Sequence, residues 1–361
     1  MEESAKTMSK GFKIFLIILI IGILFFMKVE NREKLSNIIQ DITVKEKSLD
    51  FVSRIEMEKG AESISLYDST LIKWNNNNLS FLKPDGSILW EKEYNFVNPL
   101  IHYGENWIYT IDKSTGHIYC MDKNGDTIYK AQLNESLFGV QESENNLIVH
   151  IKTSDGENIK ILDETGNIIR VHEEVDNNIL YYDINKDKTN YSVSVLNMTG
   201  DTIQSQLGIY TIGGEKIEDV DFENGIIIKT KFIGKDLLVL TDASLNYIKD
   251  GEVKWKRHFP GIKDFNLDGD KIQMLYDKNF ETIGLDGKTI DKLVFAADYT
   301  KIIPADKFTI LYGKHNIVAI NGDKEIFDYK MDKEILSLYY NQLIVYIHNA
   351  EEIEMFKLKT K

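Results

Sequence analysis

Cysteine and proline are scarce in this sequence of 361 residues. Cys120 is the only cysteine, so the chain can form no intramolecular disulfide and no cysteine cluster for a metal ion. The four prolines leave long stretches free for regular secondary structure. The motifs GxSxG, GxGxxG and the Walker loop are absent, and the seven histidines form no HExxH pair. The sequence therefore excludes a disulfide-stapled fold and lacks the local signatures of many enzyme classes.

Positive charge is outweighed by negative charge. The chain has 43 Lys or Arg against 57 Asp or Glu, which gives a net charge of −14. The acidic excess lies in the body of the chain, because the segment 1–48 holds eight basic and six acidic side chains. An acidic body repels phosphates, so we expect no nucleic-acid partner. Hydrophobic residues make up 43% of the chain, which supports a real core and argues against disorder.

Only one long apolar run occurs, IFLIILIIGILFFM at 14–27. With its flanks it spans about 28 Å as a helix, close to the roughly 30 Å of a bilayer core. No small-x-small cleavage site or lipid-accepting cysteine follows, which disfavours a cleaved signal peptide, the main alternative. We predict a short cytoplasmic tail (1–11), a transmembrane signal anchor (12–29) and a body outside the cytoplasm. Basic residues are balanced on the two sides, so this orientation rests on the short tail and the large following domain.

Residues 30–48 are charged and carry four aliphatic residues at helical spacing. These are Leu35, Ile38, Ile39 and Ile42. We predict a stalk here, with a short helix that packs on the body or on the membrane surface. The segment is too short for the several heptads of a coiled coil.

From about residue 50 the helical period disappears. Short runs rich in Ile, Val, Tyr, Phe and Leu alternate with turn signals. Glycine-containing turns recur at nearly regular intervals, at Asp85-Gly86, Asn124-Gly125, Thr165-Gly166, Gly213-Gly214, Asp250-Gly251, Asp286-Gly287 and Asn321-Gly322. Asn-Gly and Asp-Gly favour two-residue type I′ hairpins. Four short strands per unit of about 40 residues, repeated in series, are typical of β-propeller blades.

Seven units are complete, whereas an eighth at 334–361 holds only three strands. Residues 50–57, DFVSRIEM, would supply its fourth strand and close the ring without an open sheet edge. We therefore predict an all-β, eight-bladed β-propeller over residues 49–361, preceded by the single transmembrane helix. Seven blades is the alternative if the fourth or the last unit is misassigned. A stack of two-sheet sandwiches would not need so regular a period.

The repeat units also resemble a known family. LSFLKPDGSILW (79–90), YCMDKNGDTIY (119–129) and KILDETGNIIR (160–170) look like the repeat of quinoprotein-alcohol-dehydrogenase-like (PQQ-like) propellers. That repeat has an Asp three residues before the turn glycine and a Trp four residues after it. Asp122 and Asp163 match the Asp, and Trp90 and Trp255 match the Trp. Tyr129 replaces the Trp, and Arg170, Glu218 and Asp291 depart from it.

The resemblance covers residues 50–361 and implies that the Trp docks between blades. In its repeat, the sequence is similar to membrane-anchored bacterial propellers of uncharacterised function and to the outer-membrane assembly lipoprotein propeller. Quinone-dependent enzymes of this fold carry a vicinal disulfide, which a single cysteine rules out. No quinone cofactor is therefore expected.

One loop, DFNLDGD at 264–270, has the spacing of a metal site. Asp264, Asn266 and Asp268 match positions 1, 3 and 5 of an EF-hand-type calcium loop, and Gly269 matches position 6. Position 12 is Leu275, where such a loop needs a bidentate Glu. The alternative interpretation is a polar turn between two strands, which needs no metal. Cys120 is expected to be a buried, inert thiol.

An anchored repeat body without a catalytic motif favours a non-enzymatic role. We predict a bacterial, extracytoplasmic scaffold or sensor that binds a protein or cell-envelope partner. One alternative is an extracytoplasmic hydrolase or lyase built from residues of several blades on one face of the ring. The other is a propeller that binds calcium or a small ligand.

Overall fold

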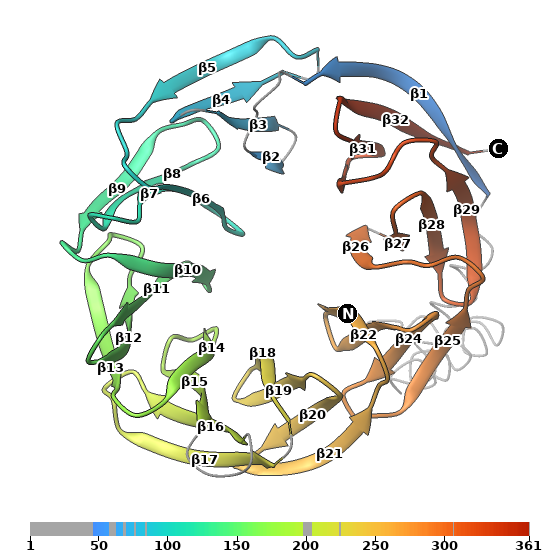
Figure 1. Ribbon diagram of the computed structural model, residues 1–361. Coiled ribbons are helices and arrows are strands. Elements are labelled where there is room, and N and C mark those ends of the chain that lie inside the picture. The colour runs from blue at the N-terminus through green and yellow to red at the C-terminus, as the bar shows by residue number, and fades with distance from the viewer. Residues whose placement is uncertain are drawn as a thin grey trace, which may run out of the picture.

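Eight four-stranded antiparallel sheets stand around a central axis as a closed ring (Figure 1). The computed structural model describes residues 46–57, 63–67, 70–75, 77–83, 85–197, 204–223, 225–305 and 307–360. In each of the first seven blades the strands follow one another from the axis to the rim in chain order. The predicted all-β, eight-bladed propeller is confirmed, and the seven-bladed alternative is wrong.

The strand bounds repeat with little variation from blade to blade. Blade 1 comprises β2 (Ser63–Tyr67), β3 (Thr70–Asn75), β4 (Asn78–Leu82) and β5 (Ile88–Glu93). Blade 2 comprises β6 (Pro99–Tyr103), β7 (Ile108–Asp112), β8 (His117–Met121) and β9 (Thr127–Gln132). Blade 3 comprises β10 (Leu137–Ser143), β11 (Asn146–Thr153), β12 (Gly156–Leu162) and β13 (Ile168–Glu174). Blade 4 comprises β14 (Asn178–Ile184), β15 (Asn190–Asn197), β16 (Gln204–Thr211) and β17 (Lys216–Glu223).

The second half of the ring continues the same order. Blade 5 comprises β18 (Ile227–Ile233), β19 (Asp236–Thr241), β20 (Ser244–Lys249) and β21 (Glu252–His258). Blade 6 comprises β22 (Ile262–Asp268), β23 (Lys271–Tyr276), β24 (Asn279–Gly284) and β25 (Thr289–Val294). Blade 7 comprises β26 (Lys301–Ala305), β27 (Phe308–Tyr312), β28 (Asn316–Asn321) and β29 (Lys324–Lys330). Blade 8 comprises β30 (Ser337–Asn341), β31 (Ile344–His348), β32 (Glu352–Thr360) and β1 (Lys47–Glu56).

Blade 8 joins the two ends of the described chain. Strand β1 is its outermost strand and pairs antiparallel with β32, from Lys47 opposite Thr360 to Glu56 opposite Glu352. A register shift between Phe51 and Ser53 bends β1 along the rim. The pairing leaves no unpaired edge between the first and the last blade, so the ring closes by hydrogen bonds across residues some 300 positions apart.

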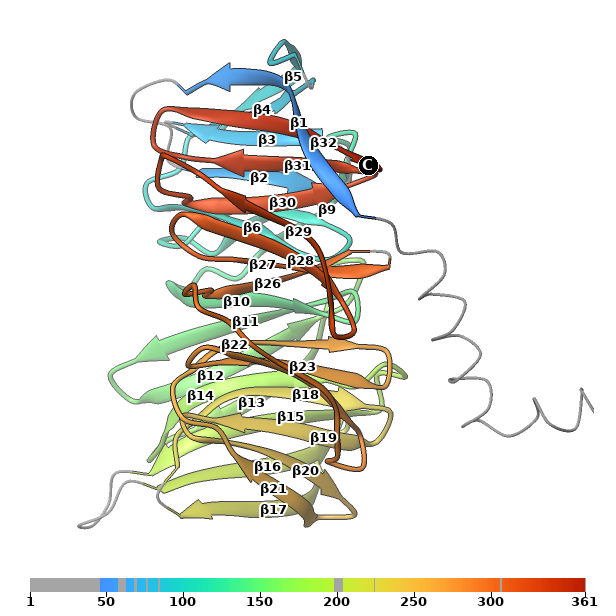
Figure 2. The same ribbon diagram turned by 90° about the vertical axis from the view of Figure 1, so that its right-hand side faces the viewer.

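The ring has two distinct faces. The face that bears Lys47 and Thr360, called the terminal face here, also carries the turns after the first and third strands of each blade. The opposite face carries the turns after the second strands and the connections between blades, and is called the connector face. Figure 2 shows β1 entering the ring from the side on which the C-terminus lies.

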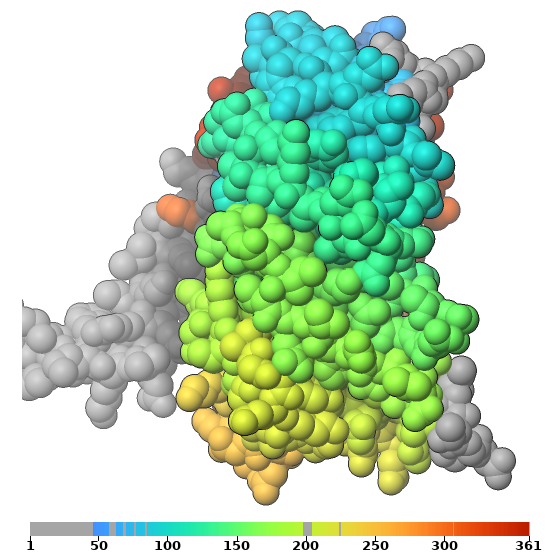
Figure 3. Space-filling model, turned by 90° about the vertical axis from the view of Figure 1, so that its left-hand side faces the viewer, coloured from blue at the N-terminus to red at the C-terminus, as the bar shows by residue number. Residues whose placement is uncertain are grey.

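The hydrophobic core is divided among the spaces between neighbouring blades. Ile148 and Ile161 of blade 3 pack with Tyr182 and Val193 of blade 4, and similar clusters fill the other gaps. Alternation along each strand sends side chains to both faces of a sheet, so a blade between two neighbours must be apolar on both. Figure 3 shows the resulting wall of blades, which follow each other in chain order down one side of the ring.

The predicted docking of Trp between blades is seen in the first repeat. Trp90 stacks on Phe81 with ring centroids 3.9 Å apart and reaches the turn of blade 2. A Cβ on Gly125 would lie 2.2 Å from the Trp90 ring, so only glycine fits beneath it. Trp255 reaches the turn of blade 6 in the same way, and its Nε1 donates to the Leu285 carbonyl at 2.8 Å.

The residues that depart from the Trp pattern occupy the same place. Tyr129 lies on Gly166, the Arg170 guanidinium on Gly214 and Glu218 next to Gly251. Ile55 of β1 contacts Gly86 and so continues the series across the closure. The position is therefore a general contact between blades, and the large aromatic is only one of the side chains that fill it.

Except at Asp250-Gly251, the turns differ from the predicted two-residue type I′ hairpins. At Asp250-Gly251 both residues have positive φ, as type I′ requires. At Asn124-Gly125 only Gly125 has positive φ, and its N–H donates to the Asp122 carbonyl at 3.0 Å. The Asp122 side chain accepts the N–H groups of Asn124 and Asp126, which holds a longer, bulged turn. The aspartate of the repeat is therefore a turn cap.

The predicted cytoplasmic tail, signal anchor and most of the stalk lie outside the described residues. Strand β1 begins at Lys47, two residues before the predicted start of the propeller. In the part of the chain that the structure describes, no helix is long and apolar enough to cross a membrane.

Candidate functional site: the central channel

Residues on or beside the innermost strands of five consecutive blades line a cavity of about 410 Å³. The lining side chains come from blades 2 to 6, namely His102, Glu105, Val140, Gln141, Glu142, Ser143, Tyr181, Asp183, Lys229, Lys231, Phe265, Asn266 and Leu267. A volume of this size suits a small molecule. The lining combines carboxyl, ammonium, imidazole and aromatic groups.

Four of these blades have an irregular innermost strand. The pairing of the first two strands shifts register at Phe138 in blade 3, Leu180 in blade 4, Ile228 in blade 5 and Lys263 in blade 6. The corresponding pairs in blades 1, 2, 7 and 8 are regular. Bulges turn side chains in a new direction and are frequent beside functional sites. The irregular half of the ring is also the half that provides most of the cavity wall.

Asp183 ties three blades together at the channel wall. Its Oδ1 accepts the Ser143 hydroxyl from blade 3 at 2.5 Å, and its Oδ2 accepts the Phe232 N–H from blade 5 at 2.9 Å. Burial raises the pKa of this carboxyl, whereas nearby Lys231 opposes the rise. Both carboxylate oxygens are therefore engaged in holding neighbouring blades at a fixed spacing.

His102 and Glu142 form a second polar group across blades 2 and 3. His102 Nε2 accepts the backbone N–H of Glu142 at 3.2 Å, so its proton lies on Nδ1 when the ring is neutral. Burial lowers the pKa of His102 and raises the pKa of the Glu142 carboxyl. Glu142 Oε1 accepts the Asn106 N–H at 3.1 Å, whereas its buried Oε2 has no hydrogen-bond partner among the described residues.

Lys229 and Lys231 place two ammonium groups on the same face of β18, inside the cavity lining. Lys231 is 3.8 Å from Glu144, and Lys229 lies over the Phe265 ring at 5.3 Å from its centroid. Burial, together with the charges of Lys231 and Lys301, lowers the pKa of Lys229. Asp264 and Asp183 oppose this effect from a distance.

The residues of the predicted calcium loop lie on β22 and the turn after it. Asp264 Oδ2 accepts the Ile302 N–H at 2.9 Å, and Asn266 Nδ2 donates to Gln273 Oε1 at 3.0 Å. Asp264, Asn266 and Asp268 sit two positions apart on an extended strand, which spaces their Cα atoms by about 6–7 Å. No group of three or more His, Cys, Asp or Glu among the described residues could hold a metal ion. A calcium site at these residues stays a prediction.

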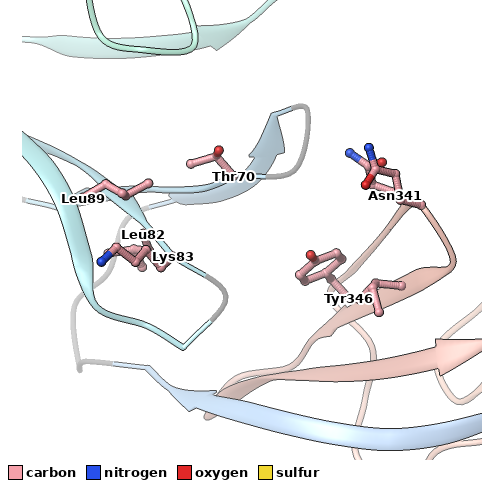
Figure 4. Close-up of a pocket in the computed structure, with 8 residues that line it drawn as sticks. Thr70, Leu82, Lys83, Leu89, Asn341 and Tyr346 are labelled. Carbon is pink, nitrogen blue, oxygen red and sulfur yellow. The ribbon is translucent and has the colours of Figure 1, made fainter.

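A second cavity, of about 350 Å³, lies on the terminal face where blade 8 meets blade 1. Figure 4 shows Thr70, Leu82, Lys83 and Leu89 on one side of it and Asn341 and Tyr346 on the other. Its lining holds a single charged side chain, Lys83. It marks the seam of the ring and offers less chemistry than the channel.

Sequence reasoning did not single out the channel lysines. Their only local signal is the run IIIKTKFI at 226–233, in which two charged residues interrupt an apolar innermost strand. Such a strand could equally have placed its lysines on an exposed edge. The cavity also depends on five strands that come from five different repeat units, which no short motif records.

These features define the protein as an eight-bladed β-propeller with a polar central channel. The chain belongs to the family of unknown function DUF5711, whose family model matches residues 42–358. No curated protein matches the chain at a significant level.

Solved propellers share the fold at low sequence identity. BamB from Moraxella catarrhalis is 13% identical with a TM-score of 0.56, over 86% of this chain and 100% of that one. The C-terminal WD40 domain of Sif2 is 12% identical with a TM-score of 0.62, over 86% and 98%. Saccharomyces cerevisiae Sqt1 is 8% identical with a TM-score of 0.62, over 87% and 100%. The predicted likeness to BamB-type propellers is confirmed at the level of the fold, whereas the PQQ-like assignment stays a prediction.

Proposed function

We propose that the protein is a membrane-anchored scaffold outside the cytoplasm that binds a protein partner through its connector face. The observation that carries the proposal is the set of bulged residues on this face. Phe138 and Ile228 are the extra residues of two bulges, and their side chains are 58% and 46% exposed. Exposed apolar side chains on one face of a protein are typical of a protein interface.

The connections between blades add to this apolar surface. Val97, Val175, Val294 and Leu336 lie in or beside these connections and are 54% to 82% exposed. Lys47 leaves the ring on the opposite face. An anchor that precedes Lys47 would therefore attach on the terminal face and leave the connector face free to meet a partner. The fold shared with BamB and with WD40 domains supports a scaffold role.

Photo-cross-linking of the full-length protein in its native membranes tests this proposal. A photoreactive residue at Phe138 should give a defined cross-linked species. A photoreactive residue at Val175 should also give a cross-linked species with the partner. The double variant Phe138→Ser/Ile228→Ser should lose this second species. The matched control is Ile128→Ser/Ile290→Ser, which changes two similarly exposed residues on the outer strands β9 and β25. Equal cross-linking in both double variants would refute a partner on the connector face.

The membrane location needs its own measurement. Externally added protease should degrade the propeller in intact cells stripped of their wall, and the protein should stay with the membranes in alkaline carbonate. Release by carbonate, or protection from protease until the cells are lysed, would contradict the proposed anchor or its orientation.

An enzyme is the second candidate, because His102, Glu142 and Asp183 converge on one cavity from three blades. The hydrogen bonds of these groups favour the scaffold instead. Asp183 is saturated by Ser143 and Phe232, and His102 accepts a backbone N–H. A general base needs a free acceptor aimed at substrate, and of the three groups only Glu142 keeps one, on a carboxyl that faces blade 2.

A further inference from the structure

The lining of the central channel carries three carboxyl groups, those of Glu105, Glu142 and Asp183, and two ammonium groups, those of Lys229 and Lys231. The acceptor oxygens of Asp183 and one oxygen of Asp264 already receive donors from the protein, and so does His102 Nε2. The Lys229 ammonium has three N–H groups and no hydrogen-bonded or ion-paired acceptor in the described part of the chain. An ammonium group that lines a cavity and has no acceptor in the protein is able to bind an anion.

Glu142, a second lining residue, directs its carboxyl toward Gly104 and Asn106 of blade 2. Glu142 is only 8% exposed, and its Oε2 has no hydrogen-bond partner among the described residues. A Cβ on Gly104 would lie 1.8 Å from this oxygen, so the chain keeps room for the carboxyl at this point. Burial raises the pKa of this carboxyl, whereas the Asn106 N–H that it accepts opposes the rise.

The bulges place this site in one half of the ring. Lys229 follows the bulge at Ile228 directly, and Glu142 lies in the bulged strand β10. Phe265 and Tyr181, from two further bulged strands, form apolar surfaces in the same lining. The regular strands of blades 1, 7 and 8 provide no lining residue.

We propose that the channel binds a small organic anion, with its carboxylate or phosphate group on Lys229 and Lys231. The Glu142 carboxyl lies on the same cavity wall, and Phe265 and Tyr181 contact the body of the ligand. The cavity of about 410 Å³ limits the ligand to a small molecule. This inference goes beyond the scaffold function, because a partner bound to the connector face would need no ligand inside the ring.

Calorimetric titration of the purified full-length protein in detergent tests the proposal. Inorganic phosphate and succinate are the two probes, each at constant ionic strength maintained with chloride. We expect at least one of them to bind with a dissociation constant of about 10 mM or tighter. Binding of phosphate alone assigns a phosphate ester, binding of succinate alone assigns a carboxylate, and binding of neither overturns the proposal.

Variants assign the binding to the channel. Lys229→Met keeps the length of the side chain and should weaken binding by at least about tenfold, since a hydrogen bond to a charged group is lost. Lys235→Met is the matched control, because Lys235 lies in the exposed turn after β18 and outside the lining. Equal affinity in Lys229→Met and wild type would place the anion elsewhere and refute the site.

Lysine labelling of the unaltered protein covers the case in which Lys229→Met fails to fold. An amine-reactive acylating reagent and peptide mass spectrometry report the modification rate of each lysine. The bound probe should slow the labelling of Lys229 and Lys231 and leave Lys235 unchanged. Equal rates at Lys229 with and without a probe that binds in calorimetry would overturn the proposal.

Discussion

At the scale of single residues, the sequence identifies contacts that repeat and misses contacts that do not. Trp90 and Asp122 could be predicted to have structural roles because their spacing from a turn glycine recurs. Lys229 and Glu142 have no such spacing, and their place in the channel follows from strands that meet only in the closed ring. The predicted burial of Cys120 is seen, and burial raises the pKa of its thiol to about 12.

His102 should make stability depend on pH near neutrality. Its folded-state pKa is lowered by burial, so the unfolded chain, with a pKa of about 6.5, takes up the proton first. The free energy of unfolding should therefore fall as pH decreases from 7 toward 5, by up to about 1.4 kcal/mol per pH unit for one fully coupled histidine. Urea unfolding at several pH values measures this slope.

The variant His102→Gln isolates the contribution of His102 to the pH dependence of the free energy of unfolding. Glutamine is neutral and keeps an acceptor for the Glu142 N–H, which lies 3.2 Å from Nε2 in the wild type. Its unfolding free energy should change less between pH 7 and pH 5 than that of the wild-type protein. His150 and His348, whose pKa values are also lowered by burial, add to the slope, whereas Glu142 and Asp183, whose pKa values are raised, oppose it. Identical slopes in variant and wild type would contradict the assignment.

At the scale of elements, each outer hairpin is held by its own turn and by the previous blade. Gly125 has a φ of +82°, and the Trp90 ring lies directly over it. Gly125→Ala therefore adds a steric clash to backbone strain. We expect the free energy of unfolding to fall by about 3 kcal/mol or more. Gly269→Ala is the matched control, because its φ is +60° and nothing lies within 4 Å of an added Cβ. The free energy of unfolding of that variant should fall by only about 1–2 kcal/mol.

A double variant separates the clash from the strain. Trp90 is half-buried, so Trp90→Ala alone should destabilise by about 2–3 kcal/mol, below the range for a fully buried aromatic. Trp90→Ala/Gly125→Ala removes the ring that meets the new Cβ, and its loss should be smaller than the sum of the two single losses. Additive losses, measured by urea unfolding, would show that the ring does not press on this turn.

At the scale of the whole molecule, the period of the turns was sufficient to predict the architecture. Seven glycines at nearly regular intervals mark the blades, and the three-stranded last unit calls for a strand from the other end. The channel could not be predicted in this way, since the register shifts at Phe138, Leu180, Ile228 and Lys263 follow no common sequence pattern. Regular features repeat and are visible in the sequence, whereas the site arises where the repeat is broken.

The pairing of β1 with β32 should allow the ring to be locked covalently. Arg54 lies directly opposite Glu354, and Cα atoms of antiparallel partners are about 4.5–5.5 Å apart, which a disulfide can span. Arg54→Cys/Glu354→Cys should oxidise readily, because buried Cys120 offers no competing thiol. The disulfide would close a loop of about 300 residues and stabilise the oxidised form by up to about 5 kcal/mol over the reduced form.

Urea unfolding of the oxidised and reduced forms measures this difference, and non-reducing electrophoresis reports the cross-link. A matched control, Arg54→Cys/Lys256→Cys, moves the second cysteine to the outer strand of blade 5, across the ring from β1. It should form no intramolecular bond. If the first pair stayed reduced in the folded protein, β1 would not be the outermost strand of blade 8. The ring would then have an open seam at the place where the structure closes it, and both edges would be free to pair with other chains.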